Sequence, residues 1–112
     1  QAIAKRQGRP WDTAKGFDDS APISAINPVA KIGHPHNVRI SLSINGELRQ
    51  DARLSQMIWS VVEIISELSK FYELQAGDLI YTGTPAGVAA TVVGDHVVAS
   101  IETVGSLEFD VI

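Results

Sequence analysis

Residues 38–51 contain the feature that most constrains the fold, an alternating stretch followed by a two-residue turn. In Val38-Arg39-Ile40-Ser41-Leu42-Ser43-Ile44, apolar and polar residues alternate, which is the period of a β-strand with one buried face. Asn45-Gly46 follows at once. This pair is favoured in a type I′ turn because both central residues take positive φ. With residues 47–51 returning, the sequence predicts an antiparallel β-hairpin over 38–51.

One clear helix and three further strands are expected after this hairpin. Ser60 and Glu63 have the spacing of a capping box, and apolar residues recur at a helical period over 60–72. Because no strand–helix–strand unit repeats, we expect an α+β fold with a mostly antiparallel sheet. The other expected strands cover residues 79–82, 96–103 and 106–111.

The first residues have the pattern of the end of a helix. Good helix formers fill positions 1–7, Gly8 occupies the position after the last turn, and Pro10 follows closely. Neither an initiator methionine nor a capping residue precedes them. We therefore expect residues 1–112 to be the C-terminal part of a longer polypeptide.

Composition argues against several classes of protein. Thirteen acidic and nine basic side chains give a formal charge of −4, which argues against nucleic acid or an anionic membrane as the main partner. The chain has no cysteine, which excludes a disulfide scaffold, a cysteine zinc site and a cysteine nucleophile. Its apolar runs are far shorter than the ~20 residues that cross a bilayer. We expect a soluble protein of the cytoplasm.

Lys15 is the first candidate functional residue, because it lies in an irregular segment beside Trp11 and Phe17. Such neighbours could partly desolvate the ammonium group, which would suit it to stabilise an anionic intermediate. The alternative is a surface lysine whose stem covers apolar neighbours while its charge stays in water. The adjacent pair Asp18-Asp19 could ligate a metal, although turn chemistry explains it more simply.

The loop Thr82-Gly83-Thr84-Pro85-Ala86-Gly87 is the second candidate. It offers backbone N–H groups and two hydroxyls, which together can hold a carboxylate or a phosphate. It is not a P-loop, because no Gly-Lys-Ser/Thr follows. A tight turn that requires small residues explains the same spacing equally well.

The remaining polar groups are weaker candidates for a metal site. His34 and His36 lie in a polar loop without a nearby carboxylate, so we interpret them as solvated, and His96 at a strand start as structural. Glu108 and Asp110 are two positions apart on one face of a strand, a spacing that metals can use. Because they alternate with apolar residues, a solvent-facing edge is the simpler interpretation.

Two longer blocks resemble the signatures of a known family. The first is Gly8-Arg9-Pro10-Trp11-Asp12-Thr13-Ala14-Lys15-Gly16-Phe17-Asp18-Asp19-Ser20-Ala21-Pro22 and the second is Gly77-Asp78-Leu79-Ile80-Tyr81-Thr82-Gly83-Thr84-Pro85-Ala86-Gly87-Val88. Between them, residues 45–50 and 57–61 also match in order and spacing. Together they resemble the fumarylacetoacetate hydrolase family over essentially the whole chain, and within it the fumarylpyruvate and acylpyruvate hydrolases.

The resemblance implies the C-terminal half of one catalytic domain, residues 1–112, with a mixed, mostly antiparallel β-sandwich roll and one main helix. It implies metal-dependent hydrolysis of a C–C bond in a β-diketo acid, with Mg²⁺ or Mn²⁺ as the ion and pyruvate released from a metal-bound enolate. An oxo-acid decarboxylase or isomerase, and a non-catalytic module with the same fold, are the alternatives. Members of the family dimerise, so a homodimer is expected.

The resemblance also implies roles for individual residues. Lys15 would stabilise the charge that develops on the enolate, Thr82 would bind the substrate carboxylate, and Gln1 matches a substrate-binding glutamine. Gly83 and Thr84 would add contacts to the substrate. The family's metal ligands, a Glu-x-Glu pair and an Asp, would lie upstream of Gln1, as would the His–Glu pair that activates water.

Overall fold

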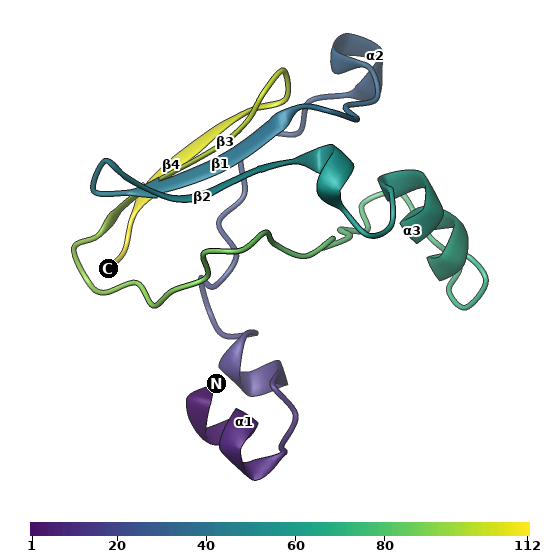
Figure 1. The fold of residues 1–112 in the computed structure, drawn as a ribbon. Helices are drawn as coiled ribbons and strands as arrows, with labels where there is room; N and C mark the ends of the chain where they lie inside the picture. The colour runs from purple at the N-terminus through teal and green to yellow at the C-terminus, as the bar shows by residue number, and fades with distance from the viewer.

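The computed structural model describes all of residues 1–112 and is built on one open, four-stranded antiparallel sheet (Figure 1). The strand order across the sheet is β2-β1-β3-β4, and every neighbouring pair is antiparallel. This confirms the expected α+β class and the antiparallel sheet. The strands are β1 (Arg39–Ile44), β2 (Glu47–Arg53), β3 (His96–Ile101) and β4 (Gly105–Asp110).

The predicted hairpin is confirmed in β1 and β2. Asn45 has a φ of 51° and Gly46 a φ of 80°, the positive values that a type I′ turn requires at both central positions. The register shifts between Leu42 and Ser43, where Arg49 is the extra residue of a β-bulge, and β2 continues to Arg53, two residues beyond the expected end.

The second hairpin is also confirmed, and it pairs with the first through β1 and β3. Its first strand ends two residues earlier than predicted, because residues 102–104 form the turn and Thr103 takes a φ of 65° there, and its second strand lies one residue earlier than predicted. Ile44 and Val97 face each other across the two central strands and are 7% and 3% exposed. They are the only buried residues, so the core lies at one end of the central strand pair.

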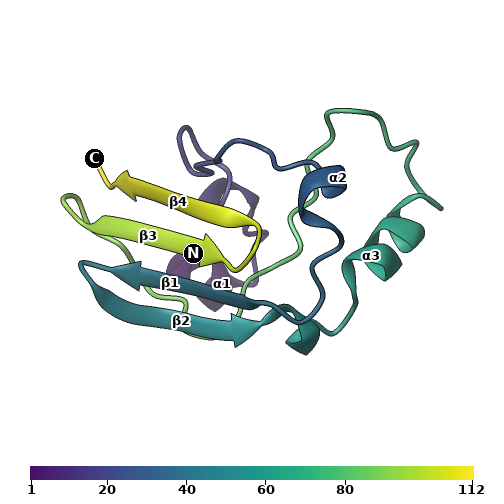
Figure 2. The ribbon, with the colours of Figure 1, turned by 90° about the horizontal axis from the view of Figure 1, so that it is seen from above.

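Two of the helices lie beyond one end of the sheet, and the N-terminal helix lies on one side of it (Figures 1 and 2). Helix α1 (Ala2–Gln7) ends as predicted at Gly8, which is left-handed with a φ of 61°. Three short turns were not anticipated, because their sequences lack a helical period. They are a 3₁₀ turn at Asp12–Ala14, the helix α2 (Val29–Ile32) and a second 3₁₀ turn at Leu54–Gln56.

The main helix, α3, covers Val61–Leu68 and begins with the predicted capping box. The Ser60 Oγ accepts from the Glu63 N–H at 3.3 Å, and the Glu63 carboxylate accepts from the Ser60 N–H at 2.7 Å. That backbone N–H holds the pKa of Glu63 below its usual range.

Helix α3 ends four residues earlier than predicted. The Ser69 hydroxyl donates to the Ser66 carbonyl at 2.9 Å, a local bond that competes with continuation of the helix. No helix in the chain is both long and apolar enough to cross a membrane.

The strand predicted at 79–82 is wrong. Residues 79–93 form an extended loop that crosses one side of the sheet, the same side on which α1 lies (Figures 1 and 2). Residues 79–91 make no backbone–backbone hydrogen bond, because no strand of this chain lies beside them. The apolar run Leu79-Ile80-Tyr81 therefore remains largely uncovered.

The chain exposes far more surface than a compact protein of its mass. Its surface is 8978 Å², against about 6000 Å² expected for a compact 12.0 kDa protein. The radius of gyration is 15.6 Å, whereas about 13 Å is expected for this length. Large apolar side chains around α3 contribute to the difference, including Trp59, Phe71, Tyr72 and the 97% exposed Ile58.

Candidate functional site

The loop singled out by its spacing lies over the sheet, beside the larger of two cavities. Thr82, Gly83 and Thr84 all line this cavity of about 610 Å³. Its volume falls within the range of small-molecule sites. The opposite wall is formed by the end of β2 and the segment that leads to α3, with the apolar side chains of Leu54, Met57, Ile58, Trp59 and Ile64. The site thus combines an apolar wall with hydroxyl and backbone groups.

A smaller cavity of about 320 Å³ lies on the other side of the same loop. Gly83, Thr84 and Pro85 line both cavities, so the loop forms the partition between them. The Asn27 side chain lines the smaller cavity and donates to the Val104 carbonyl at 2.7 Å. The position of the loop therefore decides the shape of both spaces.

Gln50, on β2, holds this loop through its side-chain amide. Its Nε2 donates to the Thr84 Oγ1 at 2.9 Å and to the Pro85 carbonyl at 2.8 Å, with a longer contact of 3.4 Å to the Ala86 carbonyl. Gln50 is half-buried and itself lines the smaller cavity. Sequence reasoning missed this residue, because Gln50 and Thr84 are far apart along the chain.

Gly87 lets the loop approach β2 closely. It has a φ of 101°, and a Cβ at this position would lie 2.1 Å from the Arg49 carbonyl oxygen. A side chain is therefore excluded both by backbone conformation and by space. Position 87 thus needs a small residue, as the structural interpretation of the loop predicts, although the loop here is extended and not a tight turn.

The far end of the loop is attached to the turn of the first hairpin. The Asp95 carboxylate accepts from the Val92 N–H at 2.9 Å and from the Asn45 side-chain amide at 2.8 Å. The Asn45 side-chain oxygen in turn accepts from the His96 N–H at 2.8 Å. The Val92 N–H, followed by the Asn45 amide, holds the pKa of Asp95 below its usual range.

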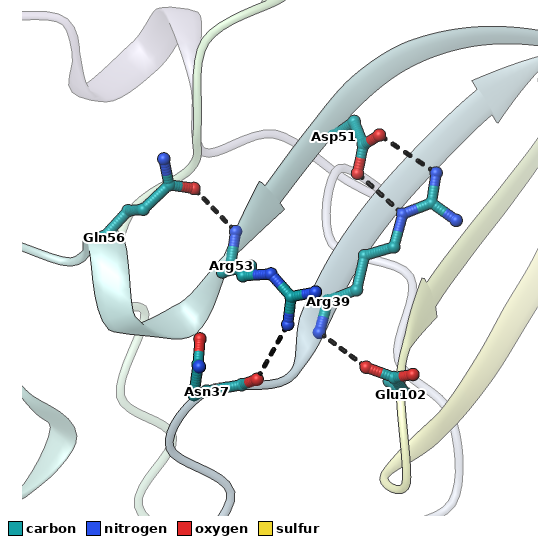
Figure 3. Close-up of polar contacts among 6 residues, drawn as sticks. All are labelled: Asn37, Arg39, Asp51, Arg53, Gln56 and Glu102. Atoms are coloured by element: carbon teal, nitrogen blue, oxygen red, sulfur yellow. Dashed lines mark hydrogen bonds and ion pairs between the residues drawn. The ribbon is translucent and has the colours of Figure 1, made fainter.

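The end of the sheet near the larger cavity is held by an exposed ion pair (Figure 3). The Arg39 guanidinium donates two hydrogen bonds to the Asp51 carboxylate, at 2.7 and 3.0 Å, and the Arg39 backbone N–H donates to Glu102 at 3.0 Å. This pairing raises the pKa of Arg39 and lowers that of Asp51. It links β1 to β2 and to the turn of the second hairpin.

The wall formed by residues 53–56 is attached to the segment before β1 (Figure 3). The Arg53 backbone N–H donates to the Gln56 side-chain oxygen at 2.7 Å, and the Arg53 guanidinium donates to the Asn37 carbonyl at 3.1 Å. The Ser55 hydroxyl donates to the Asn37 side-chain oxygen at 2.7 Å. Both Arg53 and Gln56 line the larger cavity, so these bonds stabilise its wall.

Lys15 and Gln1 lie on the N-terminal segment, and no hydrogen bond or ion pair joins either of them to the loop at 82–87. The Lys15 ammonium is exposed and lies 5.5 Å from the centre of the Trp11 ring, the arrangement of a cation–π contact. This geometry matches a surface lysine within residues 1–112. Gln1 is exposed at the start of α1. The catalytic role of Lys15 and the substrate-binding role of Gln1 stay predictions.

His96, Glu108 and Asp110 form a cluster, whereas the sequence analysis treated His96 apart from the pair of carboxylates. The His96 Nδ1 lies 2.7 Å from the Asp110 carboxylate, and its Nε2 lies 3.2 Å from the Glu108 carboxylate. The hydrogen bond to Asp110, with the charge of both carboxylates, raises the pKa of His96. The register that places His96 opposite Asp110 would have revealed the cluster.

The two carboxylates contact different ring nitrogens of His96, so this cluster is not arranged to hold a metal ion, and residues 1–112 contain no other group of three or more His, Cys, Asp or Glu side chains that could. His34 and His36 are exposed in their loop, as the solvated interpretation predicts. Asp19 takes a φ of 58°, which agrees with the turn chemistry expected of the pair with Asp18. The side chains of this chain therefore do not fit a complete metal centre by themselves.

The fold and the loop agree with one protein family. The family model described as Fumarylacetoacetate (FAA) hydrolase C-terminal matches residues 1–112. The chain therefore belongs to the fumarylacetoacetate hydrolase family, in the C-terminal part of its domain.

Relatives in this family carry two different activities in their names. The chain is 49% identical over 111 residues to the mitochondrial oxaloacetate tautomerase FAHD1 of Rattus norvegicus, covering 99% of this chain and 50% of the relative. It is 40% identical over 111 residues to a fumarylpyruvate hydrolase of Ralstonia sp, covering 99% of this chain and 57% of the relative. The chain thus spans about half the length of the curated relatives it matches.

A solved structure of a relative shares the fold of this chain. The fumarylpyruvate hydrolase of Pseudomonas aeruginosa, in complex with Mn²⁺ and pyruvate, superposes with a TM-score of 0.93 at 45% identity. The match covers 100% of this chain and 48% of that one. Members of the family named in these comparisons are hydrolases or related enzymes, and a divalent metal and a small oxo acid are ligands of this relative.

Proposed function

We propose that residues 1–112 form the carboxylate-binding side of an active site that hydrolyses a C–C bond in a β-diketo acid and releases pyruvate. The substrate is of the fumarylpyruvate or acylpyruvate type. The observation that carries this proposal is the pair of threonine hydroxyls, Thr82 and Thr84, that line a cavity of about 610 Å³ on a loop anchored to the sheet. A carboxylate accepts hydrogen bonds only, so hydroxyl and backbone N–H donors are suited to bind it.

Within this proposal each residue of the chain has a distinct task. Thr82 donates its hydroxyl to the substrate carboxylate, and Gly83 and Thr84 add donors beside it. Lys15 supplies a positive charge where negative charge develops as the C–C bond breaks, and Gln1 contributes a polar contact to the substrate. Donors and cations placed where charge develops are often the largest single contribution to catalysis.

A divalent ion, Mg²⁺ or Mn²⁺, belongs to this proposal because a relative binds Mn²⁺ together with pyruvate. Since residues 1–112 hold no complete set of ligands, we place the Glu-x-Glu pair and the Asp upstream of Gln1. The same part of the polypeptide would carry the His–Glu pair for water activation. Calorimetric titration of residues 1–112 with Mn²⁺ tests this placement: affinity weaker than millimolar is expected, and micromolar affinity would show that the chain itself holds ligands.

A second candidate function is an isomerase or decarboxylase acting on a related oxo acid. The 49% identity to a protein named oxaloacetate tautomerase favours this alternative. Both reactions need a site that binds an oxo-acid carboxylate and stabilises an enolate, so the loop serves either of them. They differ in whether a C–C bond is broken.

The full-length protein with Mn²⁺ distinguishes these functions. Release of pyruvate from fumarylpyruvate or an acylpyruvate supports hydrolysis. Interconversion of the keto and enol forms of oxaloacetate, without pyruvate release from a diketo acid, supports the tautomerase. Absence of both reactions would leave a module that keeps the fold without the chemistry.

We also propose that the intact protein is a cytoplasmic homodimer. The side chains of Ile58, Phe71 and Tyr72 are apolar and exposed, and a second copy or another part of the polypeptide would cover them. Sedimentation of the full-length protein at micromolar concentration tests the dimer, and a monomer there would contradict it. Cell fractionation tests the compartment, since the rat relative is named as mitochondrial.

A further inference from the structure

We propose that Gln50 is a positioning residue, whose side-chain amide sets the loop at 82–87 so that the Thr84 hydroxyl donates into the larger cavity. The inference rests on the proposed binding of an oxo-acid carboxylate by this loop. Gln50 itself touches neither of the reacting carbons in this account. It acts through Thr84 and through the backbone of Pro85.

The hydrogen bonds of the loop point to Gln50 as its principal polar anchor. Residues 79–91 make no backbone–backbone hydrogen bond, and every hydrogen bond that they form with the rest of the chain comes from the Gln50 Nε2. An extended segment without a neighbouring strand depends on side chains or water for its backbone groups. Removing this amide therefore leaves the segment without a polar attachment to the sheet.

The orientation of the Gln50 amide is determined by its partners. Its NH₂ group has two hydrogens, and the Thr84 Oγ1 and Pro85 carbonyl accept them at 2.9 and 2.8 Å. A carbonyl oxygen cannot donate, so turning the amide over would place the Gln50 amide oxygen against the Pro85 carbonyl oxygen. Only a donor at this position of β2 binds the Pro85 carbonyl and leaves the Thr84 hydroxyl hydrogen free.

This orientation also determines what the Thr84 hydroxyl can do. A hydroxyl has one hydrogen, and the Thr84 Oγ1 already accepts from Gln50. Its own hydrogen is thus free for an acceptor on the other side of the oxygen. Thr84 lines the larger cavity as well as the smaller one, so a substrate carboxylate in the larger cavity is a suitable acceptor.

A second contact to the same strand supports the positioning role independently. Gly87 approaches the carbonyl of Arg49, the residue directly before Gln50, more closely than any Cβ would permit. Gln50 thus holds the loop by hydrogen bonds, and Arg49 limits how closely the loop approaches β2. The threonines between these anchors gain a defined position over the cavity.

The substitution Gln50→Glu in the full-length protein tests the proposal, because it keeps the size of the side chain and replaces the donor with an acceptor. At pH 8 the carboxylate has no hydrogen for the Pro85 carbonyl, and it accepts the Thr84 hydroxyl hydrogen that a substrate carboxylate would otherwise accept. We expect the Kd for pyruvate, measured on the Mn²⁺-loaded protein, and the KM for fumarylpyruvate to rise on the order of 10- to 100-fold. The value of kcat should change less, because the loop binds the unreacting carboxylate.

A pH profile separates this role from general damage to the fold. The neighbouring oxygens disfavour the charged form of the introduced carboxyl, so its pKa is raised. Once protonated, it regains one O–H donor. The Kd of the Gln50→Glu variant should therefore move toward the wild-type value as the pH falls from 8 to 5.5. Gln75→Glu is the matched control, since Gln75 is exposed and its amide contacts only Glu73.

Cleavage after Tyr81 by chymotrypsin, in the metal-free protein, gives a readout that needs neither metal nor activity. We expect Gln50→Glu to be cleaved several times faster than wild type and than Gln75→Glu. A wild-type Kd for pyruvate together with a wild-type cleavage rate in Gln50→Glu would overturn the inference. A wild-type protein that binds pyruvate but neither hydrolyses nor isomerises oxo acids would overturn the proposed function. The comparison of pyruvate Kd and cleavage rate between Gln50→Glu and wild type would still test the role of Gln50.

Discussion

Substitution of Gly87 by alanine offers the sharpest test of how loop position controls the site. The added Cβ would lie 2.1 Å from the Arg49 carbonyl oxygen, and Cβ atoms do not approach other atoms within 3.0 Å. Either the loop or the Arg49 carbonyl, which lies at the β-bulge of β2, must therefore move by roughly 1 Å. Misplacement of binding groups by about 1 Å costs on the order of 100-fold in rate.

The substitution has a second consequence that must be separated from the first. At a φ of 101°, alanine adopts a conformation that L-residues rarely take, at a cost of about 1–3 kcal/mol in the free energy of unfolding. Gly94 provides the matched control, because its φ is 93° and nothing lies within 4 Å of an added Cβ. Gly94→Ala carries the backbone strain without the collision.

The assay compares kcat/KM for pyruvate release, and thermal unfolding, in full-length Gly87→Ala, Gly94→Ala and wild type. Both variants should lose stability, whereas only Gly87→Ala should lose about 100-fold in kcat/KM. Equal kcat/KM in the two variants would refute the reasoning, since it would mean that the contact with Arg49 does not determine where the loop lies.

Three further predictions concern individual side chains. Thr82→Val in the full-length enzyme should lower kcat/KM by roughly 10- to 150-fold, the value of one hydrogen bond to a charged group, and unchanged kinetics would make the loop purely structural. Lys15→Met should lower kcat on the order of 10²–10³-fold, with metal affinity little changed. Lys15→Arg should have little of the wild-type kcat, because a broad guanidinium replaces a point charge. A wild-type kcat in Lys15→Met would contradict the role of this lysine. Because the folded state raises the pKa of His96, its ion pairs stabilise the fold fully below about pH 6.5 and progressively less as the pH rises through the raised value. The difference in Tm between wild type and Asp110→Asn should therefore be larger at pH 5.5 than at pH 9, and a difference independent of pH would refute the pairing.

Several elements could be predicted because their determinants lie within a few residues. The Asn45-Gly46 turn requires positive φ at two adjacent positions, and the structure has it. The capping box of Ser60 and Glu63 and the left-handed end of α1 at Gly8 are equally local. The end of α3 was predicted less well, because the bond from Ser69 to Ser66 competes with a continuing apolar period.

The candidate site was predicted in part. The spacing of hydroxyls and glycines indicated the loop at 82–87, and the structure places its threonines beside a cavity. The anchor on Gln50 was not predictable, because a glutamine on a strand carries no signal of the acceptors that a distant loop will bring to it. The same holds for His96, whose two carboxylates become neighbours only through the register of β3 and β4.

By itself, the sequence determined the turns, the helix ends and the strand periods, because these depend on backbone conformation and on hydrogen bonds between residues close along the chain. Tertiary structure alone decided that residues 79–82 form no strand, since a strand exists only where another strand pairs with it. It also decided that Gly87 cannot carry a side chain and that Gln50 holds the Thr84 hydroxyl. Both contacts join residues that are far apart along the chain, and only the packing of the loop against the sheet brings them together.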